Sequence, residues 1–394
     1  MRRMRRKYKN MKTKKNINIA VIGTGFMGRT HSYSIANLQF FYENLPFKAV
    51  LHTVCSRDAQ KGEEIKNNWG FLHSETDINK ILANKDIDVI DICTPNNYHF
   101  DLILNALDAG KNIYCEKPFV ISTEQAEKVI EKLEKNKNLI CAVVFHNRFS
   151  PAVLRAKQLI DDGRLGQIIS FRCAYLHNSN IDQNKNAGWK QTAENGGGVL
   201  FDLGSHAIDL TRFLCCNNND IVSVSGKSQI FFKVRKGMDG KEWRTNADEA
   251  FYITAQLKNG AMGTIEANKL AAGTNSDLSF EIYGEKGALR FSMMQPNYLE
   301  FYDNTKPDGD YGGEKGFIKI ECVQRYPKPG NVFPGPKNPV GWVRLHMHAI
   351  YMYLDGVYNN KLNELTPDFY DGAAVQKIME KAYLSDKTGK WEKL

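Results

Sequence analysis

Short apolar runs alternate with longer amphipathic stretches through residues 16–149 of the chain. The apolar runs have the length of buried strands, and they are predicted at Ile17–Ile22, Phe47–Cys55, Ile87–Cys93, Asn112–Cys115 and Leu139–Phe145. Between them, Asp58–Trp69, Phe100–Ala109 and a segment capped by Ser122 are predicted helices. Strands that alternate with helices predict a parallel sheet with helices on both faces.

The pattern changes at residue 150, after which predicted strands dominate. Ser150 and Pro151 are typical of a helix start, and Gly163 is typical of its end. The predicted strands are Gln167–Leu176, Ile221–Val234, Ala250–Leu257, Met262–Leu270, Leu278–Tyr283 and Ala288–Ser292. Turn residues at 259–260 and 285–287 predict antiparallel neighbours. Residues 304–340, rich in Pro and Gly, predict a long loop, and residues 341–358 and 367–386 predict two closing helices.

The net charge of +9 comes from one end of the chain. Nine Lys and Arg residues and no acidic residue precede Asn16, so the remainder is neutral and argues against a nucleic-acid partner. We interpret residues 1–15 as a basic, disordered tail from an over-extended translation start before Met11, with a nucleic-acid or membrane arm as the alternative. No stretch approaches the roughly 20 apolar residues of a membrane helix. Eight cysteines without CxxC spacing favour a reducing cytoplasm.

A glycine-rich turn follows the first predicted strand. Gly23, Gly25 and Gly28 form a GxGxxG pattern that also contains Phe26 and Met27. The first glycine permits a tight turn, the second permits close approach of a pyrophosphate, and the third permits helix–sheet packing. Because the pattern lies between a strand and a helix, it predicts a dinucleotide-binding site.

The residues after the second strand bear on the cofactor. A carboxylate at this place holds the ribose hydroxyls of NAD and repels the 2′-phosphate of NADP. Ser56 stands where that acid is expected, and Arg57 can attract a phosphate. We therefore predict NAD or NADP, with Asp58 as a cap of the next helix.

The first part thus reads as a Rossmann domain, and the chain is long enough for two domains. We expect a Rossmann NAD(P)-binding domain at residues 16–149. Residues 150–394 are expected to form a second α/β domain with a large, mostly antiparallel open sheet for substrate binding and oligomerisation. We expect a homodimer or homotetramer, because a sheet covered by helices on one face leaves the other face to be covered.

Further polar residues follow the predicted strands at the same edge. The third strand is followed by Thr94, Pro95, Asn97 and His99, and the next by Glu116 and Lys117. Carboxyl ends of parallel strands share the ligand-binding edge of a sheet, so we expect these residues at the cofactor. Lys117, beside a nicotinamide, can polarise a substrate oxygen or relay its proton.

In the second part, a glycine-rich run beginning at Gly196 precedes Asp202 and His206. Their i, i+4 spacing places both on one face of a helix, where the carboxylate can orient a histidine base. Considered alone, Asp202 is interpreted as a charge that stabilises the N-terminus of a helix, and His206 as a histidine of the core. Taken with the glycine turn and Lys117, they favour a catalytic site formed by Lys117, Asp202 and His206.

At these residues the chain resembles the Gfo/Idh/MocA family (glucose-fructose oxidoreductase and inositol dehydrogenase). The resemblance covers about residues 17–390 and includes the segment Asn147–Pro151 with Arg148. It implies a tightly held NAD(P), a sugar or cyclic polyol substrate, and a lysine, an aspartate and a histidine at Lys117, Asp202 and His206. We assign Arg148, His177 and Trp189 to the substrate site, with a packed core indole as the alternative for Trp189.

The leading interpretation is an NAD(P)-dependent oxidoreductase of a sugar, sugar derivative or cyclic polyol. The alternatives are an NAD-dependent glycoside hydrolase, which the same residues serve, and a non-catalytic dinucleotide-binding protein. His346 and His348 are i, i+2 and do not share a helix face, so we predict no metal site.

Overall fold

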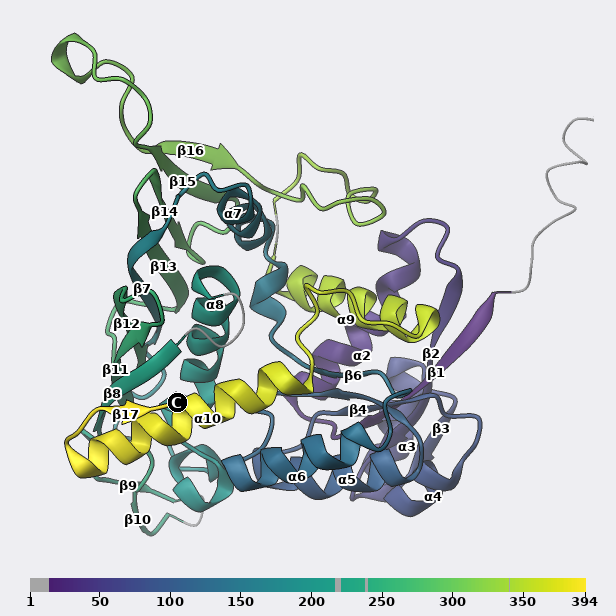
Figure 1. Cartoon of the computed structure of the whole chain (residues 1–394). Helices are drawn as coiled ribbons and strands as arrows, with labels where there is room; N and C mark the ends of the chain where they lie inside the picture. The colour runs from purple at the N-terminus through teal and green to yellow at the C-terminus, as the bar shows by residue number, and fades with distance from the viewer. Residues whose placement is uncertain (1–13, 217–220, 238–239, 340) are drawn as a thin grey trace, which may run out of the picture.

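The computed structural model describes residues 14–216, 221–237, 240–339 and 341–394 (Figure 1). Most of the predicted basic tail, residues 1–13, lies outside the described residues, and Lys15 already begins the first strand. In the described part of the chain, no helix is both long and apolar enough to cross a membrane.

A six-stranded parallel sheet occupies the first part of the chain, in the order β3-β2-β1-β4-β5-β6. The strands are β1 (Lys15–Ile22), β2 (Phe47–Cys55), β3 (His73–Glu75), β4 (Val89–Ile92), β5 (Asn112–Cys115) and β6 (Cys141–Val143). The helices are α2 (Phe26–Phe41), α3 (Ala59–Trp69), α4 (Ile78–Ala83), α5 (His99–Asp108) and α6 (Thr123–Glu134). The order reverses between β1 and β4, and in such sheets this switch point is where a dinucleotide binds. The predicted Rossmann fold is confirmed.

The second half of β1, Ile19–Ile22, is entirely apolar and buried because both of its faces are covered. Ile17, Ile19 and Val21 enter one core, which also contains side chains of α2 and α9, and Ala20 and Ile22 enter the other. Successive side chains of a strand point to opposite faces, so a continuous apolar run is what a strand between two helical layers requires.

A nine-stranded sheet fills the second part, in the order β16-β15-β14-β13-β7-β12-β11-β8-β17. Its strands are β7 (Ile168–His177), β8 (Ile221–Gln229), β11 (Ala250–Leu257), β12 (Met262–Asn268), β13 (Ser276–Gly284), β14 (Gly287–Ser292), β15 (Tyr298–Asp303), β16 (Ile318–Glu321) and β17 (Glu392–Lys393). β7 and β12 pair in parallel, whereas the other neighbours are antiparallel, which confirms the predicted mostly antiparallel sheet.

Helices cover one side of this second sheet (Figure 1). They are α7 (Pro151–Asp161), α8 (Ser205–Cys215) and α10 (Phe369–Thr388). α9 (Trp342–Asn359) instead packs against α2, and its Met347, Ile350 and Leu354 enter the core on that side of the first sheet. The C-terminal part of the chain therefore returns to cover the dinucleotide-binding fold.

Two predicted segments differ from the structure. The predicted strand Ile221–Val234 stops at Gln229, and Val234–Lys236 (β9) pairs instead with Glu242–Arg244 (β10) in a separate hairpin. The predicted loop at 304–340 contains the strand β16, which pairs with β15. The sequence analysis predicted neither of these two strands. Both β9 and β16 are short edge strands, and long-range pairing decides such strands more than local composition does.

Candidate functional site

The glycine turn joins β1 to α2 at the carboxyl edge of the first sheet. Gly23 has a φ of +106°, and a Cβ there would lie 2.7 Å from the carbonyl oxygen of Cys93. A Cβ on Gly28 would lie 2.0 Å from the carbonyl oxygen of Gly23, whereas one on Gly25 would meet nothing within 4 Å. The turn is therefore tight on the protein side and open beside Gly25 and the start of α2, where a pyrophosphate requires space. These residues fit a dinucleotide cofactor.

The residues after β2 lie where the ribose of a dinucleotide is expected. Asp58 is the N-cap of α3 and accepts a hydrogen bond from the Lys61 backbone N–H at 3.0 Å. Ser56 is buried, and its hydroxyl accepts from the Asp58 N–H at 3.3 Å. Asp58 is thus occupied as a cap, and no acidic side chain takes the place held by Ser56 and Arg57.

The loops after β4 and β5 are held together by a buried histidine. The two ring nitrogens of His99 lie 2.9 Å from the Pro118 carbonyl and 3.0 Å from the Thr94 carbonyl. The ring is fully buried, which lowers its pKa. We interpret His99 as a buried support between the loop of Thr94, Pro95 and Asn97 and the loop of Lys117, because the neutral ring donates its single N–H to one of the two carbonyls.

Glu116 is likewise an internal residue. It lies 3.1 Å from Nε2 of His31, and its other oxygen accepts from the Lys117 backbone N–H at 3.1 Å. The other nitrogen of His31 lies 2.9 Å from Asp91 and 3.3 Å from the Cys93 sulfur. Although burial opposes it, the Asp91 charge helps to hold the pKa of His31 well above its ordinary value.

Two groups of potential metal ligands meet at His31, one with Asp91 and Cys93 and the other with Glu116 and His346. The hydrogen bonds of His31 account for both carboxylates, and burial raises the pKa of the Cys93 thiol, which disfavours the thiolate that a metal requires. We interpret this cluster as a hydrogen-bonded support beneath Lys117.

Lys117 reaches from the first sheet to the second-domain residue Asp202. Its Nζ donates to the Asp202 backbone carbonyl at 2.6 Å and to Oδ1 at 3.0 Å. Asp202 lies in a short π-helical segment, Leu200–Gly204, that leads directly into α8. Asp248 accepts the Leu200 backbone N–H at 2.8 Å and so anchors the start of this segment.

Asp202 binds two more lysines that the sequence analysis did not select. Lys269 lies 2.6 Å from its Oδ2, and Lys190 lies 2.9 Å from the same oxygen. Despite burial, which opposes ionisation, the charges of Lys269, Lys117 and Lys190 hold the pKa of Asp202 well below its ordinary range. Lys269 directly follows β12 and Lys190 is adjacent to Trp189, so position at a strand end was the available signal for Lys269.

His206 lies one turn beyond Asp202, at the start of α8, and is 4% exposed. Its ring contacts Phe145, His146 and Tyr175, and its Nδ1 is buried without a hydrogen-bond partner. No hydrogen bond joins it to Asp202 among the described residues, so the predicted orientation of His206 by Asp202 is wrong. The reason is that the Asp202 carboxylate is already bound to three ammonium groups.

Burial, reinforced by the nearby Lys117 charge, lowers the pKa of His206 well below its ordinary value of 6.5. The imidazole is therefore neutral at neutral pH, as a general base must be. Lys117, Asp202 and His206 meet where the first sheet faces the second domain, although the base and the carboxylate are not joined.

The remaining predicted substrate residues separate into two sets. His177, at the end of β7, is close enough to Lys269 and Asp202 for both charges to influence its pKa, which burial lowers. Trp189 is partly exposed, and the ammonium of Lys190 lies 5.6 Å from its ring centre. Both side chains thus lie beside the Asp202 cluster.

Arg148 is buried in the interior and is 2% exposed. Its guanidinium binds Asp209 at 2.6 Å and Asp371 at 3.1 Å and lies over the ring of Phe213. Burial opposes its charge, but the two carboxylates hold the pKa of Arg148 above its ordinary value. The predicted substrate contact of Arg148 is therefore replaced by a structural ion-pair network.

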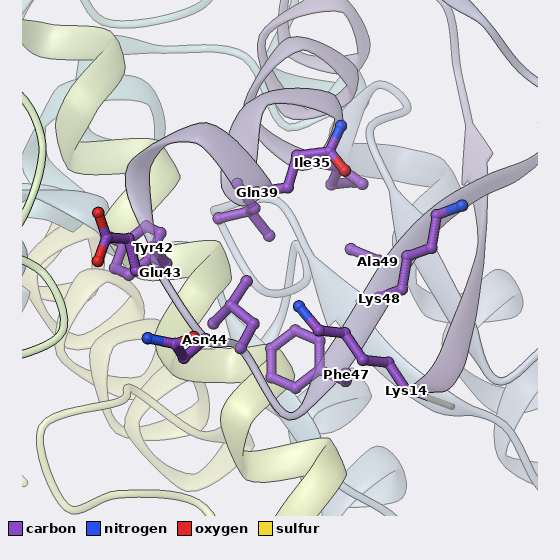
Figure 2. Close-up of a pocket in the computed structure, with 11 residues that line it drawn as sticks. Lys14, Ile35, Gln39, Tyr42, Glu43, Asn44, Phe47, Lys48 and Ala49 are labelled. Carbon is purple, nitrogen blue, oxygen red and sulfur yellow. The ribbon is translucent and has the colours of Figure 1, made fainter. Parts of the chain in front are cut away.

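A surface pocket lies at the opposite edge of the first sheet, between α2 and the amino end of β2 (Figure 2). Ile35 and Phe47 form part of its apolar lining, and Lys14 and Lys48 lie at its margin. Ligands of parallel sheets bind at the carboxyl edge, so this pocket is separate from the site around Lys117.

Comparisons with known proteins cover most of the chain. Residues 17–145 match the model of an oxidoreductase family with an NAD-binding Rossmann fold, and residues 153–290 match the GFO/IDH/MocA C-terminal domain. Levoglucosan dehydrogenase of Pseudarthrobacter phenanthrenivorans is 29% identical over 375 residues, which is 92% of this chain and 94% of that protein. Scyllo-inositol 2-dehydrogenase (NAD(+)) of Bacillus subtilis is 29% identical over 286 residues, which is 72% of this chain and 76% of that protein.

The fold is also similar to that of solved structures. A levoglucosan dehydrogenase structure in complex with NADH and levoglucosan superimposes with a TM-score of 0.89 and 27% identity. The similarity covers 96% of this chain and 99% of that one, so both sheets and their connection are shared.

Proposed function

The chain belongs to the GFO/IDH/MocA oxidoreductase family, and we propose that it is an NAD(P)-dependent dehydrogenase of a sugar, sugar derivative or cyclic polyol. The observation that carries the proposal is the meeting of Lys117, Asp202 and His206 beside an intact glycine turn. The named substrates of the two dehydrogenase relatives are an anhydrosugar and an inositol, which supports the same class of substrate here.

His206 is the general base of the proposed reaction. Its neutral imidazole accepts the proton of the reacting hydroxyl, and a bound nicotinamide supplies the acceptor for the hydride of the same carbon. Lys117 donates a hydrogen bond to the reacting oxygen. Asp202 sets the position of the Lys117 ammonium, because it holds that group at 3.0 Å.

The charge balance of the site supports oxidation of a hydroxyl. Three lysines, Lys117, Lys190 and Lys269, surround the single carboxylate of Asp202, which leaves an excess of positive charge. Positive charge that is already in place stabilises the negative charge that develops on the substrate oxygen as its proton leaves.

The proposed function is tested by a screen of sugars, anhydrosugars, sugar acids and inositols with NAD and with NADP. We expect one reduced cofactor to be formed per substrate molecule oxidised, measured by NADH or NADPH absorbance. An NAD-dependent glycoside hydrolase releases its aglycone with no net reduced cofactor. A chain that binds the dinucleotide but turns over none of these compounds would support the non-catalytic alternative.

The Ser56–Arg57 pair leads to a prediction about the cofactor. Because no acid is present to repel a 2′-phosphate, NADP should bind at least comparably to NAD. Arg57→Ala should weaken NADP binding by about 10-fold and leave NAD binding nearly unchanged, since one charge-assisted hydrogen bond is lost. Calorimetric titration of both cofactors measures this, and equal losses for the two would show that Arg57 does not contact the phosphate.

We also propose that a second copy of this chain covers the outer face of the nine-stranded sheet. Ile169 on β7, Tyr252 on β11 and Met262 on β12 point away from the helical layer and are 56%, 42% and 39% exposed. These side chains lie on three adjacent strands, on the face opposite to the helices, and a second copy packed on that face would bury them. Light scattering at micromolar concentration should give a dimer or tetramer, and a monomer would contradict this.

A further inference from the structure

The orientation of the His206 base has no explanation in the residues considered so far. A general base works well only when one ring nitrogen is held so that the other faces the substrate proton. The Asp202 carboxylate is taken up by three lysines, and Nδ1 of His206 is buried without a partner. A buried polar atom without a partner in a native protein requires an explanation.

Two polar side chains have rings against that of His206: Tyr175, whose hydroxyl is paired with Ser276, and His146. His146 begins the short helical segment His146–Phe149 that follows β6. The two ring centres are 5.1 Å apart, and the rings are nearly perpendicular at 80°. An in-line N–H···N bond of ~2.9 Å between two imidazoles also puts their centres about 5 Å apart. Both nitrogens of His146 are buried and lack partners, so an acceptor is available at the ring separation that this bond requires.

The ring of His146 is itself held from two other sides. His346 of α9 stacks on its face, with ring centres 3.7 Å apart and 23° between the planes. Trp342, at the start of α9, lies edge-on to His146, with ring centres 5.4 Å apart. Its ring centre also lies 4.3 Å from that of His346. A ring packed in this way has little freedom to turn, which is the property that a positioning residue needs.

We propose that His146 is a positioning residue for catalysis: its ring nitrogen accepts the Nδ1–H of His206 and leaves Nε2 of His206 free to take the substrate proton. The proposal rests on the proposed function. During the reaction the hydroxyl proton passes to Nε2, and the Nδ1–H of His206 stays on its nitrogen. No bond to His146 is made or broken.

The surrounding charges are compatible with this pairing. Lys117, Asp202, His346 and Tyr175 face His206, and His31 and Lys117 are the further charged neighbours of His146. Burial, followed by the neighbouring His206 and Lys117, lowers the pKa of His146 well below its ordinary value. His146 is therefore neutral, with one ring nitrogen able to accept a hydrogen bond.

The test compares three substitutions of His146. His146→Phe keeps an aromatic ring but removes both nitrogens, whereas His146→Asn and His146→Gln place an amide near the positions of Nδ1 and Nε2. We expect His146→Phe to lower kcat by about 10- to 100-fold with a smaller change in KM, and one of the two amides to recover most of the loss. The lost acceptor also stabilised the imidazolium, so the rising limb of the pH–rate profile should move to lower pH in His146→Phe.

His348→Phe is the matched control. His348 is also a buried histidine, on the same helix as His346, but its side chain binds the hydroxyl of Tyr42. Its loss should change the thermal stability and leave kcat of the folded enzyme and the pH limb unchanged. A His146→Phe enzyme with wild-type kcat and an unmoved limb would overturn the proposal. Equal losses in all three His146 variants, with the limb unmoved, would also overturn it and indicate a packing role.

A second measurement needs no substrate. The ring signals of His206, identified by their absence in His206→Ala, are titrated by NMR in the wild type and in His146→Phe. We expect the titration of His206 to move to lower pH in the variant, and an unchanged titration would contradict the pairing. If the wild type oxidises no sugar or polyol, the proposed function is wrong, while this titration still decides whether His146 and His206 interact.

Discussion

His206→Ala is expected to slow oxidation of the substrate hydroxyl by about 10²- to 10⁴-fold, or about 3–5 kcal/mol of barrier, with little change in cofactor affinity. The wild-type rate should rise with pH as His206 loses its proton. Because burial lowers its pKa, this limb should lie at lower pH than the value of 6.5 for an ordinary histidine, and it should disappear in the variant. Single-turnover formation of NADH across the pH range measures both effects.

Lys117→Ala separates the roles of the two residues. It should also lower the rate, but it removes a hydrogen-bond donor and a positive charge, so the pH limb of His206 should remain. That limb should move to higher pH, since the charge of Lys117 contributes to the lowered pKa of His206. Near wild-type turnover in His206→Ala would require another proton acceptor, for which His177, beside the Asp202 cluster, is a candidate.

Arg148→Met is expected to lower the free energy of unfolding by about 3–5 kcal/mol. The substitution leaves the buried carboxylates of Asp209 and Asp371 without the guanidinium that both of them bind, although Arg212 still contacts Asp371. Urea or thermal unfolding measures the loss. The folded fraction should retain its KM for substrate, because the guanidinium of Arg148 is buried and bound to Asp209 and Asp371.

The loss in Arg148→Met should also depend on pH. Burial raises the pKa of Asp209 to about 6 even with Arg148 present, and removing the guanidinium raises it further. A carboxyl group with a raised pKa in the folded state costs stability as the pH rises above its unfolded value. The difference between variant and wild type should therefore grow from acid to neutral pH.

Arg172→Met is the control for the loss of an arginine. Arg172 forms an exposed pair with Glu281, and its side chain is 70% exposed. Such surface pairs contribute under about 1 kcal/mol. If Arg148→Met cost no more than Arg172→Met, the buried network would not have the structural role that we assign to it.

Local sequence patterns were sufficient for five of the six strands of the first sheet, whereas the three-residue edge strand β3 was not predicted. A strand buried on both faces is mostly apolar at successive positions, as Ile19–Ile22 of β1 shows; in β4 the exception is Asp91, whose buried carboxylate is paired with His31. The glycine turn was also predictable from the sequence. A side chain at Gly28 would collide with the backbone of Gly23, and a side chain at Gly23 would collide with the backbone of Cys93, which follows β4. The cap by Asp58 was predicted for the same reason, because a cap depends on the next helical turn.

The chemistry of the second domain was predicted less completely. The spacing of Asp202 and His206 correctly placed them near each other, but it suggested a hydrogen bond that the lysines prevent. Lys269 binds Asp202 from the end of β12. Only the fold of the second sheet decides which side chains lie close enough to bind that carboxylate.

By itself, the sequence determined the Rossmann sheet, the dinucleotide turn and the identity of the residues at its carboxyl edge, because these depend on periodicity and on backbone geometry within short segments. The tertiary structure alone decided that Arg148 belongs to a buried ion-pair network, that Asp202 serves three lysines, and that His146 lies between His206 and His346. These contacts join segments that are distant in the chain. Their partners are selected by packing and by the cost of leaving a buried charge or polar atom alone, which no local pattern records.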